Sequence, residues 1–172
     1  LFLVVLSLFG INPLPFLGVA TKAPEVQMQE SAEPYQETAQ ETQLRELTAV
    51  VLADTEETWG ALLPQYGVQY VEPTLVLFSG AVQSGCGTAE SAMGPFYCPL
   101  DQKVYIDMSF YDDLSQRFGA PGDFAQAYVI AHEVGHHVQN LVGTAEKVRG
   151  LQERVSPADA NVLSVRMELQ AD

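Results

Sequence analysis

Two histidines and a glutamate stand at a spacing that suits a metal site. Residues 128–139 have the sequence YVIAHEVGHHVQ, which contains His-Glu-x-x-His. In a helix of 3.6 residues per turn, residues four apart point to the same side, so His132 and His136 could bind one metal ion. Glu133 would then lie beside a metal-bound water. This is the pattern of zinc peptidases, and a buried helix with two hydrogen-bonded histidines is the alternative.

A third ligand is available further along the chain. Catalytic zinc takes three protein ligands and keeps one position open. A helix predicted to begin after Ser156, with Pro157 at its first position, carries Glu168 and Asp172 four apart and therefore on one face. We assign Glu168 to the metal, and Asp172 as the acceptor for the outer ring nitrogen of a ligand histidine. The alternative is a solvated acidic face, the commoner fate of paired acids on a helix.

The two blocks at 132–139 and 168–172 resemble the neutral zinc metallopeptidases of the bacterial YpfJ-like family. Further blocks that carry the resemblance are TLVLFSG at 74–80, SGCG at 84–87, GPFYCP at 94–99 and VYID at 104–107. Together they cover about residues 44 to 172. HExxH followed by ExxxD is also the broader gluzincin pattern. The resemblance implies a zinc-dependent peptidase with a zincin-like fold, and it implies no particular substrate.

The function that we expect is hydrolysis of peptide bonds in a peptide or protein substrate. Zinc held by His132, His136 and Glu168 would lower the pKa of a bound water to about 7. Glu133 would take the proton as general base and pass it to the leaving amine. Two alternatives stay open: a non-catalytic, membrane-anchored metal-binding module, and a metal-dependent hydrolase of a non-peptide bond. Glu133 weighs against the first, because catalysis alone explains a glutamate that binds no metal.

The sequence also contains candidates for contact with the substrate. In zincin-like folds the substrate lies extended along an edge strand beside the metal, and by position residues 94–98 would be that strand. Pro95 suits an edge because it cannot donate to a ladder, although an ordinary loop is the alternative. No oxyanion partner is assigned. Four residues that could serve, and that structural roles also explain, are Tyr97, Tyr105, Tyr111 and His137.

Composition and charge limit the kinds of partner. The 172 residues are 47% hydrophobic and 17% charged, which is typical of one globular domain. A formal net charge of −14, from 22 acidic and 8 basic residues, argues against nucleic acid as a partner, since that calls for a basic patch. The plain explanation of the acidic excess is solubility. The oligomeric state is left open.

The first 20 residues are almost wholly apolar. Their uninterrupted run to Ile11 is shorter than the ~20 residues that span a bilayer, and Pro13 and Pro15 would end a helix. We expect the outer end of a single transmembrane helix; a secretory signal or a buried core segment is the alternative. Residues 21–40 would be a flexible acidic linker. This predicts a single-pass membrane protein with its catalytic domain outside the cytoplasm, or a secreted protein.

Residues 41–172 would form one α+β, zincin-like domain with helices packed on a small antiparallel sheet and the HExxH helix central. The strands are expected at 73–79, 94–98 and 103–110, with a glycine-rich loop at 80–94. The helices are expected at 42–63, 111–118, 123–142, 145–155 and from 157 onward. Because the chain lacks an initial Met and ends inside a predicted helix, we expect a fragment, and the family resemblance implies further C-terminal sequence.

The two cysteines, Cys86 and Cys98, flank a loop. They form neither a CxxC pair nor a Cys-His set, so a structural zinc site is not indicated. In an extracytoplasmic protein a disulfide between them is the default, and in a cytosolic protein two free thiols would be. We predict the disulfide.

Overall fold

The computed structural model describes residues 36–90, 93–111, 114 and 122–172. The chain divides into two units, Leu1–Gln36 and Glu37–Asp172. All of the first unit except Gln36 lies outside the described residues, and with it the predicted transmembrane or signal segment at 1–20 and most of the predicted linker. The second unit holds every helix and strand described here, and these make an α+β fold, as predicted.

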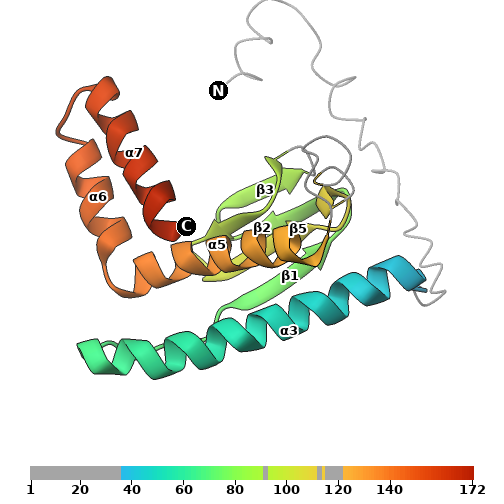
Figure 1. Cartoon of the computed structure of the whole chain (residues 1–172). Coiled ribbons are helices and arrows are strands. Elements are labelled where there is room, and N and C mark those ends of the chain that lie inside the picture. Colours follow the sequence, from blue (N-terminus) through green and yellow to red (C-terminus); the bar gives the residue numbers. More distant parts are fainter. Residues whose placement is uncertain (1–35, 91–92, 112–113, 115–121) are drawn as a thin grey trace, which may run out of the picture. The chain divides into compact units, whose positions relative to one another are not determined.

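A three-stranded sheet forms the middle of this unit (Figure 1). Its order is β1 (Thr74–Phe78), β5 (Lys103–Asp107) and β4 (Phe96–Cys98), with β5 in the centre. Strand β4 pairs antiparallel with β5, as the predicted hairpin requires, but β1 pairs with β5 in parallel. The sheet is therefore mixed, and the prediction of an antiparallel sheet is wrong. Parallel partners far apart along the chain leave no local turn signal to mark their pairing.

A second, two-stranded sheet occupies the segment predicted as a glycine-rich loop. Strands β2 (Ala81–Ser84) and β3 (Gly87–Glu90) pair antiparallel across a tight turn. A disulfide joins Cys86, in this turn, to Cys98 at the end of β4, which confirms the predicted bond. The hairpin is thus tied covalently to the edge strand of the larger sheet.

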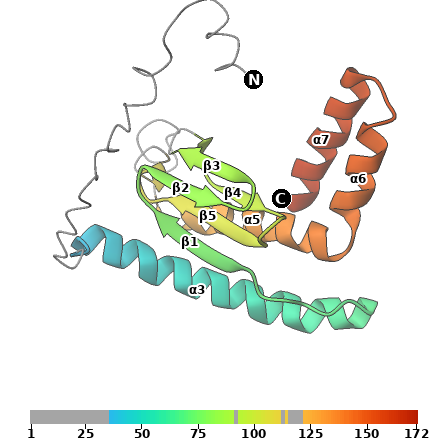
Figure 2. The ribbon, with the colours of Figure 1, turned by 180° about the vertical axis from the view of Figure 1, so that it is seen from behind.

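Each strand of the larger sheet sends alternate side chains to opposite faces, as a pleated strand must. Val104 and Ile106 face a core that Leu44 and Ile130 complete from the helices. Tyr105 belongs to a second core with Phe78, Cys98, Phe96 and Val82 of the β2–β3 hairpin. Helices therefore cover one face of the sheet and the hairpin covers the other, which Figures 1 and 2 show from opposite sides.

Four α-helices lie wholly within the described residues. Helix α3 (Ala39–Leu62) is followed by the short 3₁₀ helix η1 (Leu63–Tyr66), and helices α5 (Asp123–Leu141), α6 (Thr144–Gln152) and α7 (Pro157–Ala171) complete the fold. Helix α3 begins earlier than predicted because Thr38 and Glu41 form a reciprocal capping box. Helix α5 packs against α3, β4 and β5, while α6 and α7 form a helical hairpin that returns to α5. The short helix predicted at 111–118 falls mostly outside the described residues.

The prediction of a single-pass membrane protein is contradicted. Within the described ranges, no helix is both long enough and apolar enough to cross a bilayer. Helix α3 has the length, with 24 residues, but Glu46, Asp54 and Glu57 interrupt it with charge. The apolar segment at 1–20, on which the prediction was based, lies outside the described residues.

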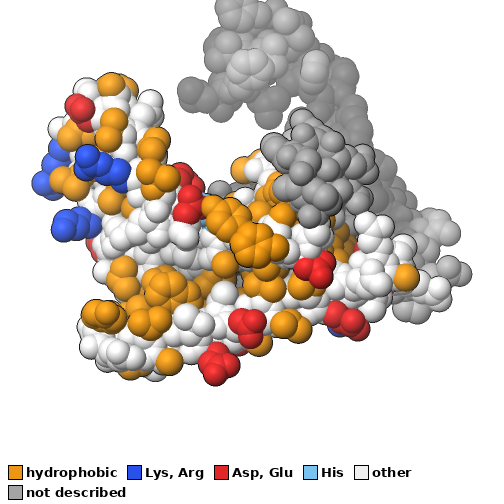
Figure 3. Space-filling view, viewed as in Figure 1, with side chains coloured by type: hydrophobic (Ala, Val, Ile, Leu, Met, Phe, Trp, Pro, Cys, Tyr) orange, Lys and Arg blue, Asp and Glu red, His pale blue; other side chains and the backbone are white. Residues whose placement is uncertain are grey.

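Charge is unevenly distributed over the described unit. Four of the eight Lys and Arg residues of the chain, Lys147, Arg149, Arg154 and Arg166, lie in or next to α6 and α7. On the face shown in Figure 3, the basic side chains gather over this helical hairpin, whereas acidic side chains appear both on the hairpin and over the rest of the unit. Residues 143–172 hold five acidic and four basic residues, so the acidic excess falls mainly outside α6 and α7.

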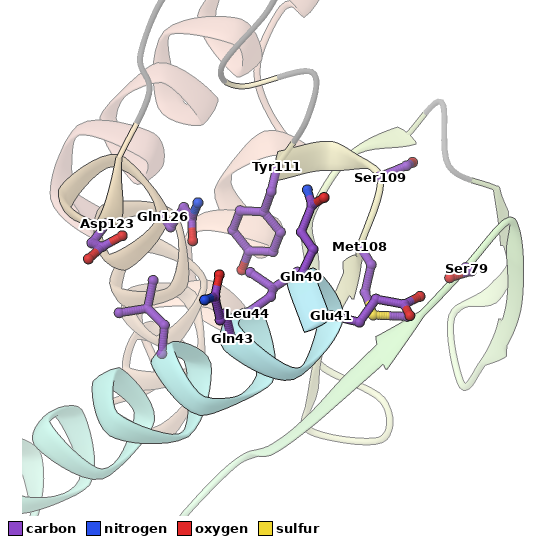
Figure 4. Close-up of a pocket in the computed structure, with 11 residues that line it drawn as sticks. Gln40, Glu41, Gln43, Leu44, Ser79, Met108, Ser109, Tyr111, Asp123 and Gln126 are labelled. Atoms are coloured by element: carbon purple, nitrogen blue, oxygen red, sulfur yellow. The ribbon is translucent and has the colours of Figure 1, made fainter. Parts of the chain in front are cut away.

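A cavity of about 610 Å³ opens where the N-terminal ends of α3 and α5 meet the end of β5. Figure 4 shows Tyr111 and the amides of Gln40, Gln43 and Gln126 around it. The described residues that line it include none of the predicted site residues. The residues predicted to carry the chemistry therefore lie outside this cavity, three of them further along α5.

Candidate metal centre

Helix α5 sets the first two candidate ligands. Its apolar residues Ile130, Val134 and Val138 turn into the core, so His132 and His136 fall at the rim of the helix. The two rings are 4.7 Å apart between centroids, and their side chains are 19% and 21% exposed. Spacing in the sequence predicted this shared face. Both rings are partly sheltered yet open on one side.

Helix α7 brings the third candidate ligand to them. It begins as predicted, with Pro157 at its first position and the Ser156 hydroxyl accepting from the Asp159 backbone N–H. At its other end, Glu168 Oε2 lies 3.3 Å from His132 Nε2 and 3.4 Å from His136 Nε2. One ligand atom from each residue lies within 4.8 Å of the others, a spacing that could hold a metal ion. Two imidazoles and one carboxylate suit zinc.

A close approach between the two helices makes this possible. A Cβ at Gly135, inside the His-Glu-x-x-His stretch, would lie 2.6 Å from the backbone oxygen of Ala171. Only glycine leaves room for the end of α7 there. The side chain of Glu168 can therefore reach the two histidines because Gly135 has none.

The outer nitrogens of both rings have acceptors. His132 Nδ1 lies 2.8 Å from Asp172 Oδ1, which also accepts from the Tyr128 hydroxyl. His136 Nδ1 lies 3.0 Å from Gln139 Oε1. Hydrogen bonds from Tyr128 and His132 hold the pKa of Asp172 below its usual value. With each Nδ1 donating, the Nε2 lone pairs are free for a metal, and both Nε2 atoms are the ones nearest Glu168.

Glu133 lies next to the ligands in a different setting. It is 6% exposed, and its carboxylate accepts a hydrogen bond from the backbone N–H of Tyr97 on β4. Burial raises the pKa of Glu133 to about 7; the Glu168 carboxylate adds to the rise, while His136 and the Tyr97 N–H oppose it. Together with His132 it lines a hollow of about 210 Å³. Glu133 is thus a buried carboxyl group facing the same opening as a candidate ligand.

The edge position predicted for residues 94–98 is correct for Phe96–Cys98, since β4 is an outer strand of its sheet, while Gly94 and Pro95 precede the strand. The 210 Å³ hollow reaches Pro95 just before β4, together with Phe110, Tyr128 and Val129. A second hollow, of about 240 Å³, lies past the other ligand and is lined by His136, Tyr97, Pro99 and Met167, among others. The candidate ligands therefore lie between two mainly apolar hollows that both touch the β4 segment.

Hydrogen bonds engage three of the four side chains considered as oxyanion partners. The Tyr105 hydroxyl donates to Asp101. The buried His137 bonds to the Val71 carbonyl oxygen through Nε2 and to the Tyr97 hydroxyl through Nδ1. The fourth, Tyr111, is buried in the core under α3. These contacts explain Tyr105, His137 and Tyr111 as structural residues, while Tyr97 also lines the second hollow.

Sequence reasoning missed Gln139 and Tyr128. Each lies on the same side of α5 as a ligand, Gln139 three residues after His136 and Tyr128 four residues before His132. That spacing was a usable signal. Which acceptor each ring nitrogen meets also depends on α7, whose position local spacing does not give.

Comparison with known proteins identifies the family. A family model described as "Putative neutral zinc metallopeptidase" matches residues 1–172. The chain belongs to this family. This confirms the family resemblance seen in the sequence.

Relatives of the chain are found in Escherichia coli and in Mycobacterium tuberculosis. The chain is 49% identical over 170 residues to the uncharacterized protein YpfJ of Escherichia coli K12, covering 99% of this chain and 58% of that protein. It is 47% identical over 118 residues to an uncharacterized protein of Mycobacterium tuberculosis H37Rv, covering 68% of this chain and 37% of that protein. The chain thus spans little more than half the length of the E. coli relative. No solved structure matches it.

Proposed function

We propose that this chain carries the catalytic centre of a zinc-dependent metallopeptidase with a zincin-like arrangement. One observation carries the proposal: His132 and His136 of α5 and Glu168 of α7 offer three ligand atoms within 4.8 Å of one another. The family's description adds zinc and a peptide bond to that geometry. Because relatives extend beyond the matched region, the activity of the whole protein is part of the proposal.

The residues of the chain have distinct tasks in this function. His132 and His136 would bind zinc through Nε2, and Glu168 would bind it through its carboxylate. Zinc supplies Lewis acidity, which lowers the pKa of a bound water and polarises a carbonyl group. Glu133 acts as the general base: it takes a proton and passes it to the nitrogen of the leaving group. The N–H of Tyr97 holds the Glu133 carboxylate in place before the reaction.

Substrate would bind as an extended segment beside β4. This strand is at the sheet edge and also contacts α5, so a peptide lying along it would pass the ligand cluster. The hollows on either side of the ligands would take side chains of that peptide.

The test is to replace Glu133 by Gln and measure zinc content and cleavage of a peptide library by the full chain. The variant should keep zinc and its fold but lose turnover by a factor of at least about 10² to 10⁴, since the general base is removed and no ligand is. Glu153→Gln, at an exposed position just after α6, is the matched control and should cleave like wild type.

Three results would count against this function. Loss of zinc from Glu133→Gln would mean that the glutamate is a ligand. Equal cleavage by the variant and wild type would remove Glu133 from the chemistry. Stoichiometric zinc in wild type, with cleavage of ester or amide substrates but of no peptide, would favour a hydrolase of another bond.

A further inference from the structure

One buried amide connects the two helices that form the candidate centre. Gln139, on α5, is only 3% exposed, although its side chain is polar. A buried amide is costly unless its donors and acceptor are satisfied. The hydrogen bonds of its side chain go either to His136 or to α7.

The hydrogen bonds fix which way the amide points. Gln139 Nε2 donates to the Met167 carbonyl oxygen at 2.7 Å and to Gln170 Oε1 at 3.2 Å. A backbone carbonyl can only accept, so the nitrogen of the amide must be on the α7 side. Gln139 Oε1 then faces His136 Nδ1 at 3.0 Å. Because that oxygen can only accept, His136 must carry a proton on Nδ1, and in the neutral ring Nε2 is then unprotonated.

The same amide also acts on the third ligand. Met167 immediately precedes Glu168, so the bond to the Met167 carbonyl oxygen holds the turn of α7 that carries Glu168. Helix α7 has no fully buried residue of its own to hold it against α5. The hydrogen bond from the buried Gln139 is therefore one of the contacts that attach α7 to α5, beside those of Asp172 with Tyr128 and His132.

A glutamate would serve only half of this arrangement. Its carboxylate could accept from His136 Nδ1–H, as Asp172 does from His132. It could not donate to Met167, and it would place a second oxygen against that carbonyl oxygen. Glutamine alone among similar side chains both accepts from the ring and donates to the helix.

We propose that Gln139 is a positioning residue for the metal centre, fixing the ring tautomer of His136 and, through the Met167 carbonyl, the position of Glu168. This rests on the proposed function in so far as zinc occupies the centre. It assigns to one amide the joint alignment of two ligands that come from different helices. The contact between Gln139 and His136 can be tested without any metal.

The experiment compares Gln139→Met, Gln139→Glu and Gln152→Met in the full chain. Gln152 is a matched control, because its Nε2 also links two helices, bonding to the Ala160 carbonyl oxygen and the Ser164 hydroxyl of α7 without touching a ligand. Zinc affinity is measured by competition with a chelator. The tautomer of His136 is read from ring-nitrogen NMR shifts in metal-free protein, with His132 as internal reference.

In the expected result, Gln139→Met binds zinc roughly 10- to 100-fold more weakly and loses the Nδ1–H signature of His136. Gln152→Met keeps both. Gln139→Glu keeps the Nδ1–H signature, because the acceptor remains, but binds zinc more weakly than wild type, because the bond to Met167 is gone.

The proposal is overturned if Gln139→Met keeps the affinity and the His136 signature of wild type, or if Gln152→Met weakens zinc binding as much as Gln139→Met. If Gln139→Met does not fold, Gln139→Glu decides: loss of the Nδ1–H signature, or zinc affinity equal to wild type, overturns it. Wild type that binds no zinc would instead defeat the proposed function, while the metal-free NMR comparison would still test the Gln139–His136 contact.

Discussion

Two carboxylates on one face of α7 meet different atoms of the same ring. Glu168 Oε2 lies near Nε2 of His132, the atom that a metal would use, and Asp172 Oδ1 lies near Nδ1. The second contact of each carboxylate also differs: Glu168 lies near His136, whereas Asp172 accepts from the Tyr128 hydroxyl. One turn of helix therefore separates a candidate ligand from a residue that orients a ligand.

Replacing each by Ala should separate these roles. Glu168→Ala leaves two protein ligands, too few for a stable catalytic zinc site, so zinc should be largely lost. Asp172→Ala leaves all three ligands and weakens only the orientation of His132, at a cost of roughly 10- to 100-fold in zinc affinity. Competition with a chelator measures both. Equal and negligible losses of zinc affinity would mean that both residues belong only to a solvated acidic face of the helix.

Away from the centre, Asp101 holds the turn between β4 and β5. Its carboxylate accepts from the Tyr105 hydroxyl at 2.6 Å and from the backbone N–H groups of Gly85 and Lys103 at 2.7 and 3.3 Å. Burial acts to raise the pKa of Asp101, but these hydrogen bonds and the Lys103 charge outweigh it and lower the pKa. The ionised form therefore stabilises the turn beside the disulfide.

This sets a direction for the pH dependence of stability. Because the folded pKa of Asp101 lies below the unfolded value of about 3.9, its contribution is present above that pH and is lost as pH falls through the folded value. Asp101→Asn should therefore lower the free energy of unfolding at pH 6 and have a smaller effect at pH 2. Urea unfolding at the two pH values measures this.

The control is Asp54→Asn, at an exposed position on α3. It should change the free energy of unfolding much less than Asp101→Asn at pH 6. An Asp101→Asn effect that is the same at both pH values would mean that the carboxylate charge does not stabilise the turn.

At the scale of elements, the contact between α5 and α7 depends on a missing side chain. In Gly135→Ala, the new Cβ would lie 2.6 Å from the Ala171 backbone oxygen, so the end of α7 must shift. We expect zinc affinity to fall by roughly tenfold or more, because Glu168 and Asp172 move with α7. The intrinsic preference of helices for Ala, about 1 kcal/mol, partly masks the effect on stability. Zinc affinity is therefore the decisive measurement.

Gly150→Ala on α6 is the matched control, because a Cβ there meets nothing within 4 Å. It should raise the free energy of unfolding by about 0.5–1 kcal/mol and leave zinc affinity unchanged. Unchanged zinc affinity in Gly135→Ala would show that the close approach to Ala171 does not set the ligand geometry.

The elements that the sequence predicted well are those with a local pattern. Apolar spacing along α5 placed His132 and His136 on one rim, and Ser156 with Pro157 marked the beginning of α7. The β2–β3 hairpin was missed because each strand has only four residues and Gly85 and Gly87 lie at the turn, so the segment resembles a loop. Its alternating pattern is too short to stand out.

What the sequence could not give is the placement of elements far apart along the chain. The parallel pairing of β1 with β5 has no turn to announce it. The reach of Glu168 to both histidines depends on how α6 and α7 fold back, on Gly135 and on Gln139. Motif spacing indicated which residues could be ligands. That they meet at one point depends on the tertiary structure.

At the scale of the whole molecule, the candidate metal centre joins helices that share the main core to a helical hairpin that does not. Helices α3 and α5 share a core with the sheet, whereas α6 and α7 have no fully buried residue among those described. A metal held by His132, His136 and Glu168 would connect these two parts directly. It would also add positive charge beside three carboxylates, those of Glu133, Glu168 and Asp172, in a chain of net charge −14.

Zinc should therefore stabilise the folded chain as a whole. A ligand that binds only the folded state at a free concentration 100 times its Kd contributes about 2.7 kcal/mol, which for a chain of this size raises Tm by roughly 5–10 °C. A chelator should reverse the shift, and Mg²⁺ should produce little of it, because Mg²⁺ prefers oxygen ligands to imidazole. Calorimetric or fluorescence melting measures Tm. Glu168→Ala should show almost no shift at the same zinc concentration, and a shift as large as that of wild type would mean that zinc stabilises the chain from some other place.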